Sequence, residues 1–361
     1  MELPQASVDW AVAAKAAVWY REAMEALQVD HLVVGGGLLG LALADQILRR
    51  GGDNVLVIEA ESAPSRRGLG GGGVVLRTGL DAYRAVEDRA LLLLEEWPDY
   101  LGVDPLYRRV ETQKYTYTEA DGNIAQAACS DGGLIDTVRL VSALHEHVRG
   151  RRGRLLFDAQ LEQIERTADR GFRFRAAGRE GVANNVYLTG SPTDARWQQV
   201  LATTPSVSLS AWHEFHLVDV AEEATILLAE LPQRTVETIG LALEEDDDDA
   251  DGVPTGACWV QDGTGGARLL LEGAPTTTTT EPTVDWAILE HCRRELGPSV
   301  AALLSGTVRR GSAELCWGLD PMLPQAAATK LWVAGSFGMH GVLLSLGLAE
   351  QIAISATTPG T

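Results

Sequence analysis

The sequence predicts an α/β fold, in which a Rossmann-like domain of alternating strands and helices contains an inserted, mainly antiparallel β-domain. Two observations support this prediction. Residues 30–61 contain an apolar run, a glycine turn, a helical segment and a second apolar run, which is the order of a βαβ unit. Residues 331–354 repeat the strand, the glycine turn and the helix, whereas residues 195–310 contain mostly strand-length segments.

The turn inside the first βαβ unit reads Gly35-x-Gly37-x-x-Gly40. In a dinucleotide-binding turn, the first glycine allows a tight bend and the second lets the backbone approach a pyrophosphate. The third lets the helix pack closely on the strand, and the helix N-terminus attracts the anion. Glu59 follows the second apolar run, 19 residues beyond Gly40, where a carboxylate can accept hydrogen bonds from a ribose. An ordinary tight turn is the alternative, but the strand, helix and acid together favour dinucleotide binding.

Two segments flank this unit. Residues 8–27 have the apolar periodicity of a helix, which is expected either to pack on the domain surface or to form a contact in a homodimer. Residues 62–75 contain Gly68 and the run Gly70–Gly73. Because this glycine loop directly follows Glu59, we expect it to wrap a cofactor; a simple linker is the alternative.

The remaining elements follow from apolar periodicity. Helices are expected at residues 38–50, 80–100, 137–148, 284–296 and 342–354, and strands at 31–34, 55–58, 107–117, 154–157, 160–166, 172–177, 186–189, 207–220, 224–231, 257–260, 268–271 and 331–334. The predicted domains are a helical extension at 1–28, a nucleotide-binding domain at 29–77, 129–194 and 311–357, and a substrate domain at 78–128 and 195–310.

Composition and charge exclude several classes of partner. The chain of 361 residues has a formal net charge of −20, which opposes nucleic-acid binding because that binding depends on Lys and Arg. No run of about 18 apolar residues occurs, so we expect no membrane span. The four cysteines form no CxxC pair, and the N-terminus lacks the pattern of a secretory signal. These features favour reduced thiols in a cytoplasmic protein.

No metal site is predicted. Asp247, Asp249 and Asp251 match the start of a calcium loop, but Cys258 stands at the twelfth position, where that loop requires Glu. We therefore interpret the acidic run as a solvated loop. His213 and His216 fall on a predicted strand, where the helical spacing of metal ligands does not apply.

Five segments, in the same order, resemble the FAD-dependent oxidoreductases typified by D-amino-acid oxidase, glycine oxidase and monomeric sarcosine oxidase. Their order and spacing carry the resemblance, because no single segment is specific. They are Gly35, Gly37 and Gly40 with Glu59; the glycine loop with Val75-Leu76-Arg77; Asp131-Gly132 with the following helix and Leu161; Tyr187-Leu188-Thr189-Gly190; and Trp317-Gly318-Leu319-Asp320-Pro321-Met322 followed by Gly335-Ser-Phe-Gly338-Met-His340-Gly341.

The resemblance implies FAD between the two glycine turns and oxidation of a C–N bond in a small amine or amino acid. Hydride would pass to the flavin N5 and leave an imine. Some members attach flavin through a cysteine at the position of Leu315, next to Cys316; we predict non-covalent FAD, with attachment to Cys316 as the alternative. The implied cofactor contacts are Gly35, Gly36, Gly37, Leu39, Gly40, Glu59, Ala60, Gly72, Gly73, Leu161, Thr189, Gly190, Gly335, Gly338, His340, Gly341 and Val342.

The candidate substrate residues depart from the family pattern. Met339 stands where glycine oxidase has a carboxylate-binding arginine, and Leu343 stands where sarcosine oxidase has a lysine. Arg77 resembles the sarcosine oxidase arginine after the glycine loop, and it is either a carboxylate anchor or a partner of nearby acids. Tyr117 is expected either to line the substrate pocket or to pack within its sheet.

His340 is the candidate catalytic residue, because the resemblance places it beside the flavin; a histidine that only closes the turn is the alternative. Two other functions remain open. One is a flavin dehydrogenase of a 2-hydroxy acid that passes electrons to a quinone or carrier. The other is a flavin-binding protein without turnover, suggested by Met339, Leu343 and Asp320, which replaces a family arginine.

Overall fold

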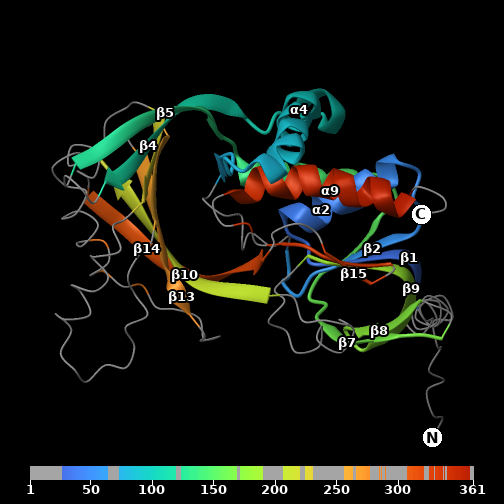
Figure 1. Ribbon diagram of the computed structural model, residues 1–361. Coiled ribbons are helices and arrows are strands. Elements are labelled where there is room, and N and C mark those ends of the chain that lie inside the picture. The colour runs from blue at the N-terminus through green and yellow to red at the C-terminus, as the bar shows by residue number, and fades with distance from the viewer. Residues whose placement is uncertain are drawn as a thin grey trace, which may run out of the picture.

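The structure is a computed structural model, in which each of two lobes is built on one β-sheet (Figure 1). It describes residues 27–63, 73–118, 123–168, 171–189, 206–219, 224–230, 256–262, 266–276, 284, 286, 289, 307–320, 325–328, 330–335, 337 and 340–357.

The first sheet joins strands from both ends of the chain. Its order is β15 (Gln325–Ala328), β16 (Leu331–Val333), β9 (Arg179–Leu188), β1 (Leu27–Val34), β2 (Val55–Ile58) and β6 (Arg154–Leu156), with a hairpin of β7 (Leu161–Arg166) and β8 (Phe172–Ala176) paired to β9. The pairs from β16 to β6 are parallel, whereas β15 and the hairpin pair antiparallel. β1 is central, so the glycine turn that follows it lies in the middle of the sheet edge.

Four helices pack over one face of this sheet: α2 (Leu38–Arg49), α4 (Arg84–Leu101, after a short 3-10 turn η1 at Asp81–Tyr83), α5 (Thr137–Gly150) and α9 (Gly341–Thr357). The β7–β8 hairpin covers the other face (Figure 1). Almost every residue in the first half of α2 and of α9 is buried, which explains why these segments lack a polar stripe. Within the described residues, no helix combines the length and apolarity that a membrane crossing needs.

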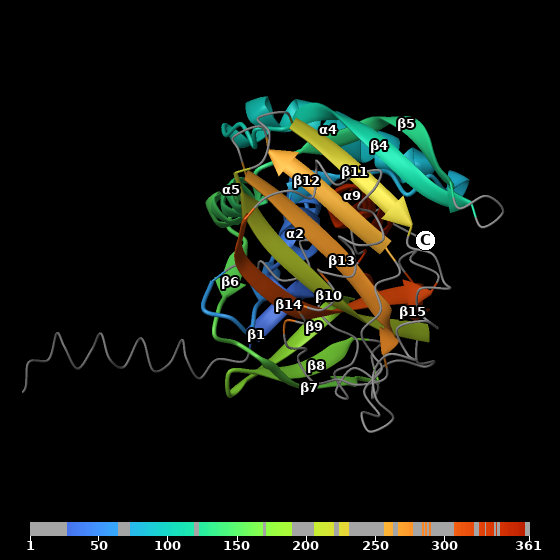
Figure 2. The same cartoon turned by 90° about the vertical axis from the view of Figure 1, so that its left-hand side faces the viewer.

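The second sheet faces the viewer in Figure 2. Its order is β14 (Thr307–Asp320), β10 (Ser206–Val218), β13 (Gly266–Thr276), β12 (Gly256–Asp262), β11 (Ala224–Glu230), β4 (Arg108–Thr118), β5 (Asn123–Leu134) and β3 (Val74–Val75). Neighbouring strands are antiparallel except β11 and β4, which are parallel. The predicted fold class, a Rossmann-like domain with a mainly antiparallel β-domain, is therefore confirmed.

The two faces of the second sheet have different neighbours. Cys258 and Leu270 pack with Val74 and Leu76, which follow Gly73, the last glycine of the glycine loop. We call this the inner face. Phe215 lies on the opposite face, where its ring centroid is 5.4 Å from that of Trp286. Because side chains alternate along a strand, residues two positions apart share a face.

Several elements differ from the sequence-based expectation. β3, β5, β14 and β15 were not predicted, and β1 begins at Leu27, where a helix was expected to end. The rest of that helix, residues 8–26, and most of the helix at 284–296 lie outside the described residues. Strands β3, β5 and β14 belong to the second sheet although parts of them fall in ranges assigned to the nucleotide-binding domain. α4 packs on the first sheet although it falls in the range 78–128. The domain division itself stays a prediction.

Candidate functional site

The glycine turn after β1 leaves no room for side chains. Gly35 has a φ of 115°, which favours glycine. A Cβ added to Gly40 would lie 1.8 Å from the Gly35 carbonyl oxygen, so the helix contacts the turn at van der Waals distance. The Thr189 hydroxyl donates to the carbonyl oxygens of Val34 and Gly35, at 3.0 and 3.2 Å, and holds the end of β1 from the neighbouring strand.

Glu59 is tied to the same turn. Its Oε2 accepts a hydrogen bond of 2.6 Å from the Gly36 N–H, and its Oε1 accepts one of 3.1 Å from the Glu61 N–H. The residue is 8% exposed, and a Cβ on Gly36 would lie 2.9 Å from the Glu59 Cβ. The acid therefore lies beside the glycines, as a ribose-binding acid does, and it also stabilises the turn.

The N-terminus of α2 is open to an anion. Gly37 is its N-cap residue, no side chain caps it, and no acidic residue occurs in its first turn. Main-chain N–H groups of a first turn without a cap are available to a phosphate, and the helix dipole favours negative charge there. The described part of the turn therefore fits the pyrophosphate of a dinucleotide.

A second glycine turn links the two sheets. Gly73 has a φ of 96°, and a Cβ there would lie 2.3 Å from the Ile135 carbonyl oxygen. The Ile135 N–H donates a bond of 2.9 Å to the Gly73 carbonyl. The last residue of the glycine loop is thus held against the start of α5 by close backbone packing.

His340 stands at the start of α9. Its Nδ1 lies 3.4 Å from the Leu76 carbonyl oxygen, and its N–H donates to the Phe337 carbonyl at 3.0 Å. Burial lowers the pKa of His340, and the Leu76 bond and the Glu87 charge offset part of that effect. A neutral ring that donates from Nδ1 keeps Nε2 as an acceptor. His340 therefore connects the start of α9 to Leu76, the residue after β3, as a turn-closing histidine would.

Arg77 faces acids in this structure. Its guanidinium contacts Asp88 at 2.6 Å and Glu87 at 3.9 Å, and the buried Glu87 carboxylate also accepts from the Thr78 N–H at 2.6 Å. These contacts agree with the interpretation of Arg77 as a partner of nearby acids. Its role as a carboxylate anchor stays a prediction.

The other predicted site residues fall in three groups. Leu39, Val342 and Leu343 are buried in the core between the first sheet and its helices, and Leu161 is buried on the opposite face. Gly335, with a φ of 155°, comes shortly after β16, Gly341 is the first residue of α9, and exposed Ala60 follows Glu59. Gly72, Gly190, Gly338, Met339 and the side chain of Tyr117 lie outside what the structure describes.

Two charged residues that were not predicted from the sequence, Arg268 and Glu214, also lie near the second glycine turn. Arg268 Nη2 is 3.9 Å from the position that a Cβ on Gly73 would take, and Glu214 pairs with Arg268. Neither stands in a recognisable motif. The pairing of β10 and β13 brings Glu214 beside Arg268, and the packing of Val74 and Leu76 against Val260 and Leu270 brings this part of the sheet close to the glycine turn.

The turn, the acid and the two sheets have the geometry of an α/β protein with a dinucleotide-type turn and a β-sheet lobe beside it. Solved structures share this fold. The open form of NikD, "an unusual amino acid oxidase essential for nikkomycin biosynthesis", is 16% identical, with a TM-score of 0.70 over 92% of this chain and 96% of that chain. L-proline dehydrogenase from P. horikoshii is 14% identical, with a TM-score of 0.71 over 91% and 93%.

Glycine oxidase from Geobacillus kaustophilus is 15% identical, with a TM-score of 0.70 over 93% of this chain and 96% of that chain. No protein-family model matches the chain, and no curated protein matches its sequence. The chain thus has the fold of amino acid oxidases and of this dehydrogenase. Because the identities are low, the likeness establishes the fold alone.

Proposed function

We propose that the protein is an FAD-dependent oxidoreductase that oxidises a C–N bond of a small amine or amino acid. The observation that carries this proposal is the glycine turn, where Gly40 touches Gly35, Glu59 binds the Gly36 N–H, and α2 starts without a cap. The fold it shares with amino acid oxidases supports the reaction class.

The residues around the turn fit FAD. The first turn of α2 would hold the pyrophosphate, and Glu59 would accept from the ribose with its remaining lone pairs. Gly73 and the start of α9 would lie against the rest of the cofactor. When bound, FAD supplies the redox chemistry, because it accepts a hydride from the substrate carbon next to nitrogen.

The protein would contribute orientation and electrostatics. The N-terminus of α9 carries a partial positive charge, which favours negative charge placed at that end. His340, with its pKa lowered by burial, stays neutral near pH 7 and can keep a proton on Nδ1 for the Leu76 carbonyl. Its Nε2 can then accept a hydrogen bond from a substrate or cofactor group.

The cofactor is proposed to be non-covalent. Cys316 belongs to β14, where it pairs with Ser210, and Pro321 follows the end of that strand. Acid precipitation of the purified protein tests this point directly. Flavin that stays in the supernatant supports non-covalent binding, whereas flavin retained in the pellet and lost in Cys316→Ser indicates attachment.

The first test of the whole proposal is an absorbance spectrum, repeated without oxygen during titration with amines, amino acids and 2-hydroxy acids. We expect flavin bands that an amine or amino acid bleaches. Bleaching by hydroxy acids alone would replace the proposal with the hydroxy-acid reaction, and a colourless protein that takes up no added FAD would overturn it. Reoxidation by air separates an oxidase from a dehydrogenase.

A further inference from the structure

Three titratable side chains share the inner face of the second sheet. His216 on β10 is directly opposite Arg268 on β13, and Glu214 is two residues from His216 on the same face. Glu214 Oε1 lies 3.7 Å from Arg268 Nη1 and 3.4 Å from His216 Nε2. Glu214 is thus the shared contact of two groups that can carry positive charge.

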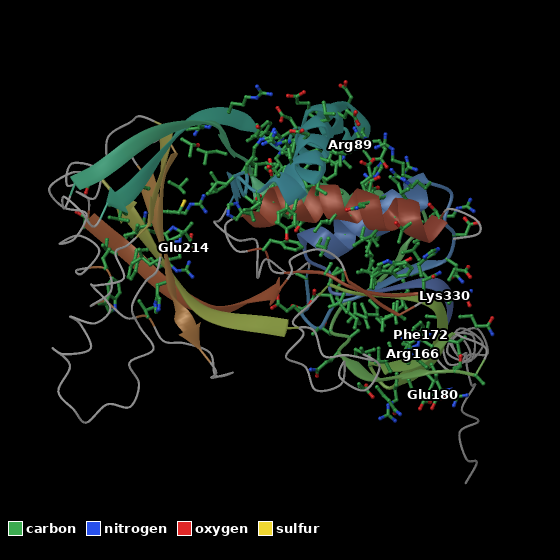
Figure 3. The ribbon with its side chains drawn as sticks, in the orientation of Figure 1. Arg89, Arg166, Phe172, Glu180, Glu214 and Lys330 are labelled. Atoms are coloured by element: carbon green, nitrogen blue, oxygen red, sulfur yellow. The ribbon has the colours of Figure 1, made fainter. Side chains whose placement is uncertain are left out.

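The register of β10, β13 and β12 places these side chains on the face of the sheet that packs against the residues following the glycine loop. Arg268 is opposite Val260 on β12, and Glu214 is opposite Leu270. Val260 and Leu270 pack in one cluster with Val74 and Leu76, the residues that follow the loop. Figure 3 shows Glu214 on this side of the sheet, which faces the helices of the first lobe.

Arg268 also reaches the loop itself. Its Nη2 lies 3.9 Å from the position of a Cβ on Gly73. The side chain is 25% exposed, so it contacts both solvent and the turn. A guanidinium in this place faces the groups that we propose to hold FAD, rather than the outer surface of the sheet.

The ion pair of Arg268 is looser than that of Arg77. Arg77 makes a contact of 2.6 Å with Asp88 and one of 3.9 Å with Glu87, whereas Arg268 pairs with Glu214 at 3.7 Å. A distance of 3.7 Å is longer than a hydrogen bond, so the Arg268 donors aimed at Glu214 are weakly used. A planar carboxylate can satisfy such a fork with two parallel hydrogen bonds.

We propose that Arg268 binds the carboxylate of the substrate and that Glu214 is its resident counter-ion, which competes with that carboxylate. The substrate is accordingly an amino acid with a free carboxylate, rather than a simple amine. This inference rests on the proposed function, which it narrows to one substrate class, and it assigns to Arg268 the anchoring role first expected of Arg77.

The test measures binding of butanoate, with butanamide as its uncharged analogue, to the purified protein after incubation with FAD, by saturation-transfer NMR, which needs no flavin signal. We expect butanoate to bind the unaltered protein and butanamide to bind at least tenfold more weakly. Arg268→Gln should weaken butanoate binding about 10- to 100-fold, because two charge-assisted bonds are lost. Glu214→Gln should strengthen it severalfold, because the competing negative charge is gone.

Arg109→Gln is the matched control, since Arg109 is an exposed arginine of the same sheet that pairs with Glu95 on α4. It should leave the butanoate affinity unchanged. Equal affinity in Arg268→Gln and the unaltered protein would overturn the assignment, as would weaker binding in Glu214→Gln. Flavin content is measured separately on each sample and tests the proposed function, which requires bound FAD. A flavin-free protein overturns that function even if Arg268 proves to bind carboxylates.

Discussion

The turn between β1 and α2 depends on glycines, because it has no room for a Cβ atom at Gly36 or Gly40. The Gly35 carbonyl occupies the place of a Cβ on Gly40, and the Glu59 side chain crowds that of Gly36. Because the start of α2 packs closely on the turn, the first N–H groups of α2 and the Glu59 carboxylate lie at the same turn. A backbone shift of even part of an ångström would separate groups that we propose to contact one cofactor together.

Gly40→Ala is therefore expected to lower FAD occupancy at least tenfold and to destabilise the fold by about 1–3 kcal/mol, the usual cost of overpacking. The overlapping atom is a backbone oxygen 1.8 Å away, so no side chain can rotate to relieve it. Flavin absorbance per protein after reconstitution with FAD measures the first effect, and urea unfolding measures the second.

Gly150→Ala provides the matched control. Gly150 ends α5, and a Cβ there would meet nothing within 4 Å. It should keep full occupancy and gain slightly in stability, because alanine favours helix. If Gly40→Ala binds FAD as well as Gly150→Ala does, the assignment of this turn to the cofactor is wrong.

For single residues, the sequence predicted a glycine turn with an acid near it but not the contacts between them. The spacing of the glycines and Glu59 predicted a turn and an acid near it, and the structure has both. The bond from the Gly36 N–H to Glu59 was not predictable, because motif spacing carries no side-chain conformation. The position of Arg268 beside Gly73 was not predictable either, since it follows from side-chain packing between segments that are distant in the sequence.

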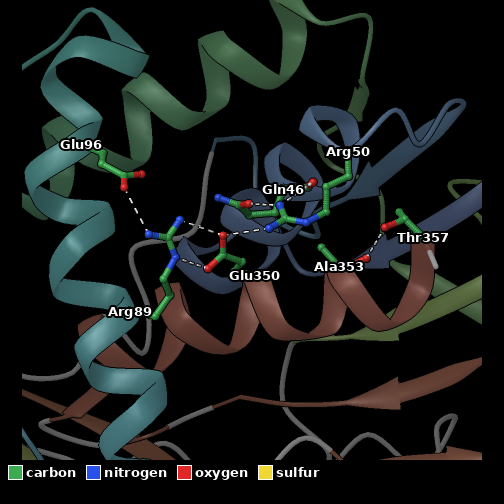
Figure 4. A network of polar contacts seen from close by, with 7 residues as sticks. All are labelled: Gln46, Arg50, Arg89, Glu96, Glu350, Ala353 and Thr357. Carbon is green, nitrogen blue, oxygen red and sulfur yellow. Dashed lines mark hydrogen bonds and ion pairs between the residues drawn. The ribbon is translucent and has the colours of Figure 1, made fainter.

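Among the elements, α9 is joined to its neighbours by one acid. Glu350 on α9 accepts from Arg50 at the end of α2, at 2.8 Å, and from Arg89 on α4, at 2.5 and 3.1 Å (Figure 4). Burial alone would raise the pKa of Glu350, but the bonds from Arg89 and Arg50 outweigh it, so the pKa is lowered. Three helices that carry or support the site thus share one carboxylate.

Glu350→Gln should lower the free energy of unfolding at pH 7 by about 1–3 kcal/mol, because two guanidinium groups lose a mostly buried charged acceptor. The contribution of the carboxylate is present above its unfolded pKa, near 4.5, and is lost as the pH falls through the lower folded pKa. Urea unfolding between pH 3 and 7 measures both effects, and the difference between the two proteins should shrink at the acid end.

Glu95→Gln is the control, because both side chains of the Arg109–Glu95 ion pair are exposed to solvent. Water and salt screen exposed ion pairs, so this change should hardly alter the free energy of unfolding. An equally small loss in Glu350→Gln would show that packing alone joins α9 to α2 and α4.

Prediction of the elements succeeded where apolar runs are continuous. α2, β2 and α5 begin where expected, and the end of α2 differs by one residue. β5 was missed because its sequence, NIAQAACSDGGL, is polar and rich in small residues, and β15 was missed because QAAA has no strand preference. Such segments become strands because neighbouring strands supply hydrogen bonds, which is a tertiary effect.

In the whole molecule, the two lobes meet at the glycine loop. β3 follows Gly73 and pairs with β5 of the second sheet, while the Gly73 carbonyl accepts from Ile135, just before α5 of the first lobe. His340 adds a contact from α9 to Leu76. The order of strands in the second sheet, including the parallel pair of β11 and β4, could not be predicted, because loops between strands do not specify which edges meet.

This shared loop leads to a prediction about FAD and the stability of both lobes. A ligand that binds only the folded state, present at about 100 times its Kd, stabilises that state by about 2.7 kcal/mol. Because Gly73 contacts both lobes, FAD should raise the midpoint of one common thermal transition rather than protect the first lobe alone. Calorimetry with and without FAD measures this shift, and Gly40→Ala should lose it while Gly150→Ala keeps it. Two separate transitions, only one of which responds to FAD, would mean that the second sheet unfolds independently of the cofactor site.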